Sequence, residues 1–228
     1  MNVLSIVHSP EARTELFARA GHPIDEWSFS GGGAPPDGYD AYMVFGGAMH
    51  PDQDLVHPWL VDEAAWLRGV IESGAPVLGV CLGAQLIARA TGAWSGRLAG
   101  EPEIGWYEVA LTDVGAADPV LGSMPSTFDA LEWHHYTYDL PAGAVELARN
   151  DRCNQAFRLG DACWAVQFHP EVTHAQVLGW LDDPDDPAPD PAALRHETAE
   201  KIERWNELGL ALCNAFLTAA ERSLARAA

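Results

Sequence analysis

The sequence is poor in basic residues and lacks any long apolar run. Its 13 Lys and Arg stand against 33 Asp and Glu, which gives a formal net charge of −20 at pH 7. Nucleic-acid backbones and anionic membranes are themselves negative, so both are poor partners for this chain. No stretch approaches the roughly 18 apolar residues of a membrane span, and the opening MNVLSIVHSP lacks the features of a signal peptide. We therefore expect a soluble, cytoplasmic protein that binds neither nucleic acid nor membrane.

Cysteine is also scarce, and no metal-binding pattern is present. The four cysteines have neither the C-x-x-C spacing of a zinc site nor the density of a disulfide framework, which suits a reducing compartment. They are Cys81, Cys153, Cys163 and Cys213. The run DDPDDPAPDP at residues 182–191 lacks the glycine and the terminal glutamate of a calcium loop. Its prolines cannot continue a helix, so we interpret it as a solvated loop.

The first half of the chain alternates strand-like and helix-like segments. Apolar runs and apolar residues at helical spacing predict strands at 3–7, 26–29, 41–45 and 76–80, and helices at 11–20, 57–73 and 82–90. Such alternation is typical of a parallel sheet covered by helices. The glycine-rich loop that precedes the third strand has no Lys-Ser or Lys-Thr after it, which argues against a phosphate-binding loop.

After residue 92 the pattern changes to short strands separated by turn residues, which predicts a β-rich second half. These strands are expected at residues 93–98, 106–111, 128–133, 145–149, 155–159 and 162–168. The 228 residues suit a single domain, residues 1–228. We divide it into a catalytic core at 1–181, the acidic loop at 182–191 and a C-terminal part at 192–228 that consists of one or two helices.

The stretch GAPVLGVCLGAQLIARAT, residues 74–91, predicts a buried strand that ends at Cys81 and passes directly into a helix. Gly79 and Gly83 flank Cys81 two residues away on each side, so the backbone has room for the sharp turn of a nucleophile elbow. The first amides of the helix would favour a thiolate at Cys81, because their partial charge is positive. The alternative is a buried cysteine that only packs in the core.

A base for such a nucleophile stands at the end of a later strand, AVQFHPE, residues 165–171. In extended backbone His169 and Glu171 point to the same side, and Pro170 stiffens the turn between them. His169 could take the proton of Cys81 and deliver it to a leaving amine, while Glu171 could fix the imidazole. For His169 alone, a structural histidine is the alternative. The joint presence of the cysteine elbow and His-Pro-Glu favours a catalytic triad.

Three motifs resemble the class I glutamine amidotransferase domain. They are YMVFGG at 42–47, GVCLGAQ at 79–85 and QFHPE at 167–171. Either of the last two alone would be only suggestive, whereas together they are highly specific, and the resemblance covers most of the chain.

The resemblance implies roles for individual residues. Cys81 would be the nucleophile, His169 the base and Glu171 its partner. The backbone amides of Gly47 and Leu82 would form the oxyanion hole, as two donors aimed at the developing tetrahedral oxygen.

Two further positions are expected to contact the substrate. Gly46 would contribute backbone at the carboxyl end of its strand, where ligands meet doubly wound sheets. Gln85 lies one helical turn after Cys81 and matches the family glutamine that helps hold the amino-acid end of the substrate.

The runs EIGW, at 103–106, and Trp133-His134 also resemble the stand-alone branch of the family, the GMP-synthase-like amidotransferases and γ-glutamyl peptidases. Many relatives carry Trp-His-x-Asp, whereas His135 and Tyr136 follow here, so the usual contact to the substrate ammonium is in question. His134 and His135 either line the pocket or serve as a turn residue and a cross-strand partner.

The expected fold is a flavodoxin-like α/β sandwich with a mostly parallel central sheet, a β-rich insertion and a C-terminal helical cap. The resemblance implies hydrolysis of a γ-glutamyl amide through a cysteine thioester, which requires neither a metal nor an organic cofactor. Three interpretations are open: a self-sufficient γ-glutamyl hydrolase, a glutaminase subunit that passes ammonia to a separate synthetase, and a catalytically silent binding protein. The intact Cys81, His169 and Glu171 argue against the third.

Overall fold

The computed structural model of the chain describes residues 1–8 and 14–227, and its centre is a nine-stranded sheet. The order of strands across this sheet is β2-β1-β3-β4-β11-β10-β9-β6-β7, and β5 and β8 pair separately. The strands are β1 (Val3–Ile6), β2 (Ile24–Trp27), β3 (Ala41–Val44), β4 (Val77–Val80), β5 (Ser95–Arg97), β6 (Glu103–Leu111), β7 (Thr127–His134), β8 (Tyr136–Tyr138), β9 (Ala144–Arg149), β10 (Asn154–Leu159) and β11 (Cys163–Val166).

The sheet has a parallel half and an antiparallel half. Strands β2, β1, β3, β4 and β11 run parallel to one another, whereas β10, β9, β6 and β7 are joined by antiparallel pairings. Strands β1, β4 and β11 are apolar and buried on both faces, as expected where helices cover both sides. The alternating first half of the sequence thus forms most of the parallel sheet, and the later short strands form its antiparallel extension.

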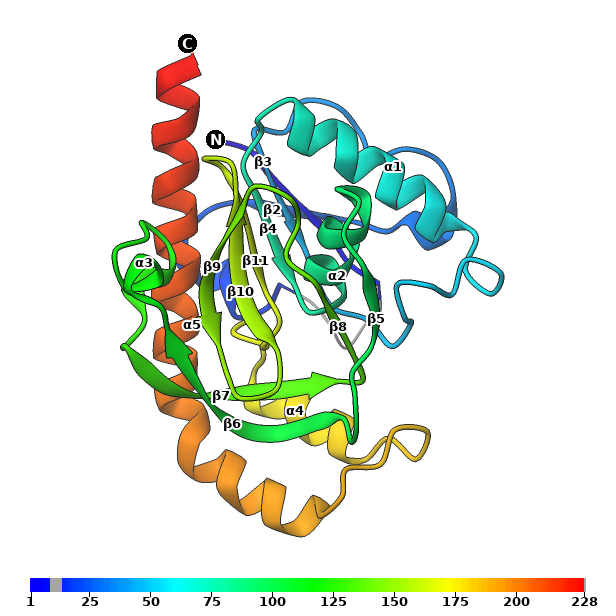
Figure 1. The fold of residues 1–228 in the computed structure, drawn as a ribbon, viewed down its shortest axis with the longest axis vertical. Coiled ribbons are helices and arrows are strands. Elements are labelled where there is room, and N and C mark those ends of the chain that lie inside the picture. The colour runs from blue at the N-terminus through cyan, green and yellow to red at the C-terminus, as the bar shows by residue number, and fades with distance from the viewer. Residues whose placement is uncertain (9–13, 228) are drawn as a thin grey trace.

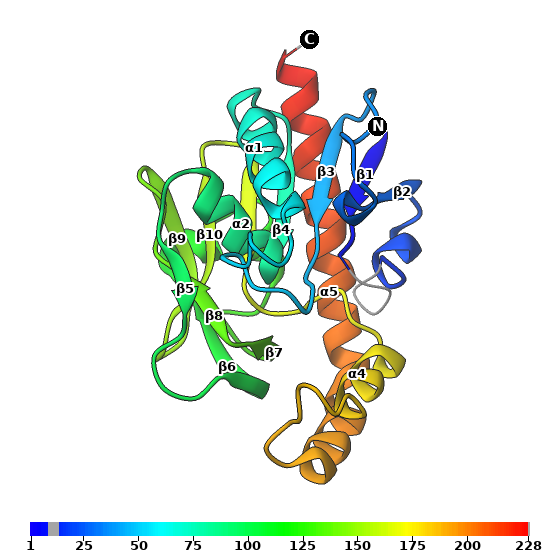
Figure 2. The same cartoon turned by 90° about the vertical axis from the view of Figure 1, so that its right-hand side faces the viewer.

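Helices cover both faces of the sheet. Figures 1 and 2 show α1 (Trp59–Glu72) and α2 (Leu82–Ala90) on one face and the long α5 (Pro191–Ala227) on the other. Two apolar clusters correspond to these faces, one around α1 and α2 and one along α5. The shorter helices are α3 (Asp113–Ala116) and α4 (His174–Leu181), and three 3-10 turns, η1 (Phe17–Ala20), η2 (Phe29–Gly31) and η3 (Leu121–Ser123), complete the described elements.

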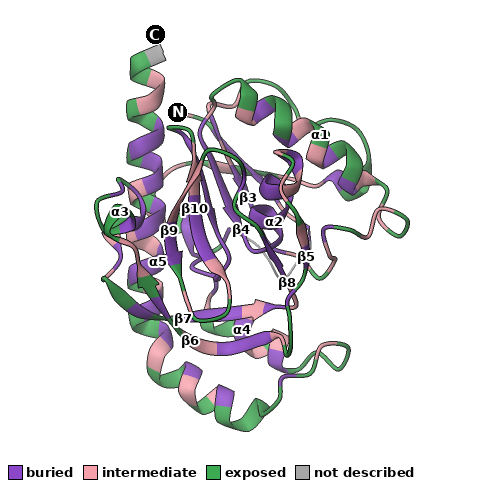
Figure 3. Ribbon diagram, in the orientation of Figure 1, coloured by how far each residue is buried: buried purple, intermediate pink, exposed green. Residues whose placement is uncertain are grey.

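Figure 3 shows the strands of the sheet largely buried between these helices, and the outward faces of α1 and α5 exposed. No helix in the described ranges is long and apolar enough to cross a membrane.

Several predicted boundaries were wrong. The helix expected at 11–20 falls partly outside the described residues, and its described end is a turn followed by η1. The strand expected at 26–29 runs from Ile24 to Trp27, and β6 begins at Glu103, ahead of the expected 106. Residues 191–227 form one helix, and α4 was not predicted. Its signal is the capping box in which Thr173 and Gln176 satisfy each other's backbone amides.

Candidate active site

Cys81 stands at the junction of β4 and α2 in a backbone conformation that side-chain-bearing residues seldom adopt. Its φ is 51°, the only positive φ of a non-glycine residue in the described chain. A Cβ on Gly83 would lie 2.0 Å from the carbonyl oxygen of Val44, and one on Gly79 would lie 2.8 Å from Gly83. Only glycine therefore fits on either side of the turn, and the predicted elbow geometry is present. Strain of this kind collects at functional sites.

His169 and Glu171 form a buried hydrogen-bonded pair at the end of β11. Nδ1 of His169 donates to Oε1 of Glu171 at 2.9 Å, and Nε2 has no hydrogen-bond partner of ordinary geometry among the described residues. Burial by itself lowers the pKa of His169, but the charges of Glu171 and Cys81 outweigh it and raise that pKa well above its ordinary value. The raised pKa favours the protonated form of His169 beside the sulfur of Cys81.

The turn that carries this histidine is held from behind by α5. The indole Nε1 of Trp205 donates to the carbonyl oxygen of His169 at 2.8 Å, and Asn206 donates to that of Val172 at 2.7 Å. Gly209 lets the helix approach so closely that a Cβ there would lie 1.9 Å from the carbonyl oxygen of Pro170. The orientation of the imidazole thus depends on a helix remote in sequence.

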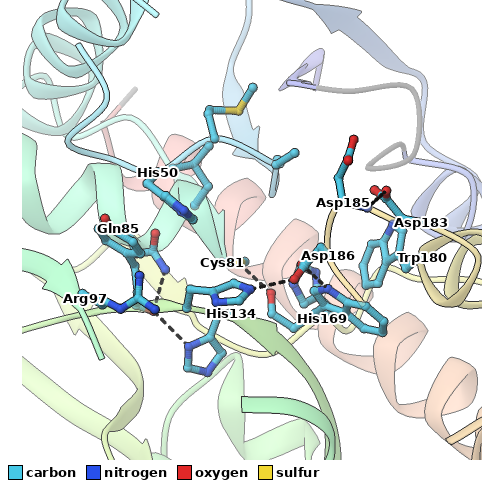
Figure 4. A pocket seen from close by; sticks show the side chains of 17 residues that line it. His50, Cys81, Gln85, Arg97, His134, His169, Trp180, Asp183, Asp185 and Asp186 are labelled. Carbon is cyan, nitrogen blue, oxygen red and sulfur yellow. Dashed lines mark hydrogen bonds and ion pairs between the residues drawn. The ribbon is translucent and has the colours of Figure 1, made fainter. Parts of the chain in front are cut away.

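A cavity of about 490 Å³ opens in front of Cys81 and His169 (Figure 4). Gly47 and Leu82, the two residues expected to supply oxyanion-hole amides, line it. Gly46 packs against both reacting side chains, since a Cβ there would lie 3.0 Å from the His169 ring and 3.5 Å from the Cβ of Cys81. The structure therefore brings these residues, which are far apart in sequence, around one space.

Gln85 also lines the cavity, but its amide is already engaged. Nε2 donates to the carbonyl oxygen of Tyr136 at 2.9 Å and to Oε1 of Gln167 at 3.2 Å. These bonds fix the wall of the cavity formed by the Tyr136 backbone. The Gln85 carbonyl oxygen remains the atom able to accept a hydrogen bond from a bound molecule.

His134 is a buried, ion-paired residue that lines the cavity. Its Nε2 lies 3.0 Å from Oε2 of Glu103 and 3.2 Å from Oε2 of Glu132, and its Nδ1 donates to the Tyr136 carbonyl oxygen at 2.9 Å. Burial by itself lowers the pKa of His134, but the two carboxylates and Cys81 raise it to about 9. An imidazolium close to the nucleophile adds positive potential where a thiolate would form.

His135 and Tyr136 form the outer wall of the cavity. The ring of Tyr136 stacks on His50 with centroids 4.1 Å apart. His135 Nε2 pairs with Oδ1 of Asp186 at 2.8 Å, and the indole of Trp133 donates to Oδ2 of the same carboxylate at 2.8 Å. Both histidines of the Trp-His-His-Tyr run line the cavity. Asp186 belongs to the acidic loop, which sequence analysis treated only as a solvated connection.

Among the described residues, one group has the donors of a metal site: Glu103, His134 and Cys153, whose ligand atoms lie within 4.8 Å of one another. Hydrogen bonds from neighbouring amides already engage two of them. Asn150 donates to Glu103 at 2.7 Å, and Gln155 donates to Glu103 at 3.2 Å and to the Cys153 sulfur at 3.4 Å. Together with the ion pairs of His134, these contacts engage side-chain atoms of all three residues.

Sequence analysis missed a second buried ion pair, His8 with Glu63, whose imidazole also contacts the Gly46 carbonyl oxygen. The available signal was Glu63. In α1 it occupies a position of the buried stripe otherwise filled by Leu60, Leu67 and Val70, and a carboxylate in such a stripe requires a buried partner.

The family of the chain follows from comparison with known proteins. The family model for glutamine amidotransferase class-I matches residues 24–177, which is more than half of the chain. The chain belongs to this family. Class-I amidotransferases are cysteine-dependent amidohydrolases, and the resemblance drawn from the three sequence motifs is confirmed.

Relatives in the family differ in length and described activity. The glutamine amidotransferase-like protein YfeJ of Salmonella typhimurium is 29% identical over 189 residues, which cover 79% of this chain and 79% of YfeJ. The γ-glutamyl-L-1-hydroxyisopropylamide hydrolase of a Pseudomonas species is 31% identical over 155 residues, covering 64% of this chain and 52% of the hydrolase. The GMP synthase of Thermomicrobium roseum is 39% identical over 109 residues, which cover 47% of this chain but only 20% of that enzyme.

Solved structures of class-I amidotransferases share the fold. A glutamine amidotransferase from Thermotoga maritima superposes with a TM-score of 0.83 at 24% identity, covering 95% of this chain and 97% of the other. One from Methylobacillus flagellatus gives 0.83 at 24% identity, covering 96% and 94%. The flavodoxin-like α/β sandwich predicted from sequence is confirmed, with parallel strands in the first part of its sheet, an antiparallel β-rich extension and a C-terminal helix.

Proposed function

We propose that the chain is a cysteine hydrolase that cleaves γ-glutamyl amides, with Cys81, His169 and Glu171 as its catalytic triad. The observation that carries this proposal is the convergence of a positive-φ cysteine at a helix N-terminus with a histidine whose Nδ1 is held by a buried carboxylate. Nε2 of that histidine is left to serve the sulfur.

The first half of the reaction is acyl transfer to Cys81. Its thiolate attacks the γ-carbonyl carbon, a C–S bond forms, and the carbonyl electrons move to oxygen, where the amides of Gly47 and Leu82 stabilise the negative charge. As the C–N bond breaks, His169 gives its proton to the departing amine. The products are a γ-glutamyl thioester and a free amine or ammonia.

The second half is hydrolysis of the thioester. His169 accepts a proton from water as the oxygen attacks the acyl carbon, and the C–S bond breaks to release glutamate and regenerate Cys81. Glu171 keeps Nδ1 protonated and stabilises the imidazolium that forms. The steps are carried by the side chains of Cys81, His169 and Glu171 and by the backbone amides of Gly47 and Leu82.

Binding of the glutamyl half is assigned to Gly46, Gln85 and the Tyr136 wall, with His134 beneath the wall and His135 at the outer rim. The leaving-group side opens toward the acidic loop, where Asp183 and Asp185 line the mouth of the cavity. A site that hydrogen-bonds α-amino and α-carboxyl groups rejects analogues lacking them by roughly 10⁴-fold, whereas an open side discriminates weakly.

A second candidate is a glutaminase subunit that delivers ammonia to a separate synthetase. It is supported by the 34% identity over 144 residues to one subunit of the glutamine-hydrolysing GMP synthase of Thermoplasma volcanium, which covers 61% of this chain and 66% of that polypeptide. The hydrolase of Pseudomonas supports the first candidate.

The test is covalent labelling followed by substrate profiling. A γ-glutamyl chloroketone should give one adduct by intact-protein mass spectrometry, absent in Cys81→Ala. Burial raises the pKa of Cys163 and Cys213 to about 12, and burial also raises the pKa of Cys153, so none of the three should compete. An adduct on any of them would overturn the assignment of the nucleophile.

Profiling then separates the two candidates. Glutamine and several γ-glutamyl dipeptides should be cleaved within a modest range of one another, and α-linked glutamyl peptides should remain intact. Glutamine cleavage that appears only after a synthetase partner is added would favour the second candidate, and efficient cleavage of α-linked peptides would contradict both.

A further inference from the structure

His8 and Glu63 are buried ionisable residues beside the candidate site with no part in the chemistry described above. Nε2 of His8 lies 2.9 and 3.0 Å from the two oxygens of Glu63, and neither side chain is exposed. His8 follows β1, whereas Glu63 is in α1. Burying an ion pair costs free energy that apolar residues of similar volume would not, so the pair calls for a local purpose.

The contact made by the second ring nitrogen of His8 indicates that purpose. Nδ1 of His8 donates to the carbonyl oxygen of Gly46 at 3.2 Å. Both ring nitrogens thus have acceptors, as an imidazolium requires. Burial lowers the pKa of His8, but Glu63 and the backbone carbonyls of Gly46 and Phe45 raise it above its ordinary value.

The Gly46–Gly47 peptide is the unit that this hydrogen bond restrains. In a trans peptide the carbonyl oxygen and the following N–H point in opposite directions, so holding the Gly46 oxygen against His8 turns the Gly47 amide away from it. Two successive glycines leave the peptide plane little intrinsic restraint. His8 also lies directly under Gly47, since a Cβ there would be 2.6 Å from the Cβ of His8.

We infer that His8, held by Glu63, is a positioning residue that fixes the Gly46–Gly47 peptide with the Gly47 amide aimed at the oxyanion. The inference rests on the proposed acyl-transfer chemistry. His8 is not among the residues that line the cavity. It acts through one backbone amide, so its removal should harm steps that develop an oxyanion and spare those that do not.

Two substitutions isolate the hydrogen bond to Gly46. His8→Leu removes the donor, whereas His8→Asn keeps an amide donor near the Nδ1 position. Both leave Glu63 without its partner, so the difference between them reports the Gly46 contact and not the loss of the ion pair. If His8→Leu does not fold, the double variant His8→Leu/Glu63→Leu removes the unpaired charge and serves in its place.

Three rates are measured for each variant. Turnover of a γ-glutamyl amide and inactivation by a γ-glutamyl chloroketone both pass through a tetrahedral oxyanion. Alkylation of Cys81 by iodoacetamide does not, because sulfur displaces iodide directly from a saturated carbon. For His8→Leu we expect kcat and chloroketone inactivation to fall on the order of 10- to 100-fold, less than the roughly 10²- to 10³-fold cost of losing an oxyanion donor outright. Iodoacetamide alkylation and KM should stay near wild type, and His8→Asn should recover most of the loss.

Each other outcome overturns the inference. Unchanged turnover in His8→Leu shows that the peptide needs no restraint from His8, and equal loss in all three rates shows that the residue supports the fold or the thiolate instead. Equal loss in His8→Asn and His8→Leu removes the Gly46 hydrogen bond from the explanation. Failure of the wild-type protein to react with the chloroketone, despite normal iodoacetamide alkylation, would instead count against the proposed function.

Discussion

At the scale of single residues, the histidines in and around the candidate site have different hydrogen-bond partners, and we infer a different role for each. His169 faces the sulfur with Glu171 behind it, His134 is enclosed by Glu103 and Glu132, and His8 contacts a backbone carbonyl. The same side chain is a proton carrier in the first environment and a fixed charge or backbone restraint in the others. The role of each histidine is therefore inferred from its hydrogen-bond and ion-pair partners.

The two partners of Cys81 should not matter equally. His169→Ala should remove nearly all turnover, with kcat falling roughly 10⁴-fold, because the base that moves the proton is lost. Glu171→Gln should leave a measurable remainder, since a neutral amide can still hold the imidazole. Steady-state kinetics on a γ-glutamyl amide check both values. Equal losses would mean that Glu171 does more than orient its neighbour.

His134 predicts a pH dependence of stability. Its pKa is raised from 6.5 to about 9 in the folded protein, so the folded state holds this proton more tightly than the unfolded state. The resulting stabilisation is fully present below about pH 6.5 and is lost as the pH rises through about 9. Glu103, Glu132, Cys153 and Cys81 are the ionisable groups that face it.

The measurement is urea unfolding of wild type and His134→Gln between pH 6 and pH 10. The variant should be less stable at pH 6, and the gap in the free energy of unfolding should shrink toward pH 9. A gap that stayed constant across this range would show that His134 contributes by packing alone.

At the scale of elements, Asp186 ties the acidic loop between α4 and α5 to the wall of the cavity. Asp186 accepts hydrogen bonds from Trp133 and His135, and Asp183 and Asp185 also line the cavity. Asp186→Ala should release the loop, which hydrogen exchange of residues 182–190 would detect as faster labelling. KM for a γ-glutamyl dipeptide should rise more than kcat falls, with Glu221→Ala, at an exposed position of α5, as the control. Unchanged exchange would show that Asp186 does not hold the loop in place.

Sequence patterns predicted elements well where local rules dominate. The strand-Cys81-helix elbow could be predicted because Gly79 and Gly83 report a steric requirement that lies within a few residues. Glu63 and Asp186 could not be assigned partners, because the groups that pair with them, His8 and His135, come from distant segments of the chain. Strand β8 was missed for a similar reason, since its three residues pair only with the equally short β5.

At the scale of the whole molecule, α5 joins the rear face of the sheet to the His-Pro-Glu turn. Gly209→Ala should push this helix off Pro170, because the new Cβ would lie 1.9 Å from a carbonyl oxygen, and overpacking of this kind costs typically about 1–3 kcal/mol. Gly69→Ala in α1 is the matched control. It has open space around it, so it should stabilise by roughly 0.5–1 kcal/mol through helix propensity. Thermal melts and turnover are measured for both variants. Equal shifts in melting temperature would contradict the close contact between α5 and Pro170.

The placement of β11 beside β4 has a consequence for folding kinetics. Val166 pairs with Val80, so the strand that leads to the nucleophile and the strand that leads to the base become neighbours only when a very long segment of chain has closed. Local helices and hairpins form early in folding, whereas contacts between distant residues must first overcome the entropy of loop closure. During refolding, recovery of helix signal should precede recovery of γ-glutamyl amide turnover, because the cysteine of the nascent chain has no base beside it until that late pairing occurs.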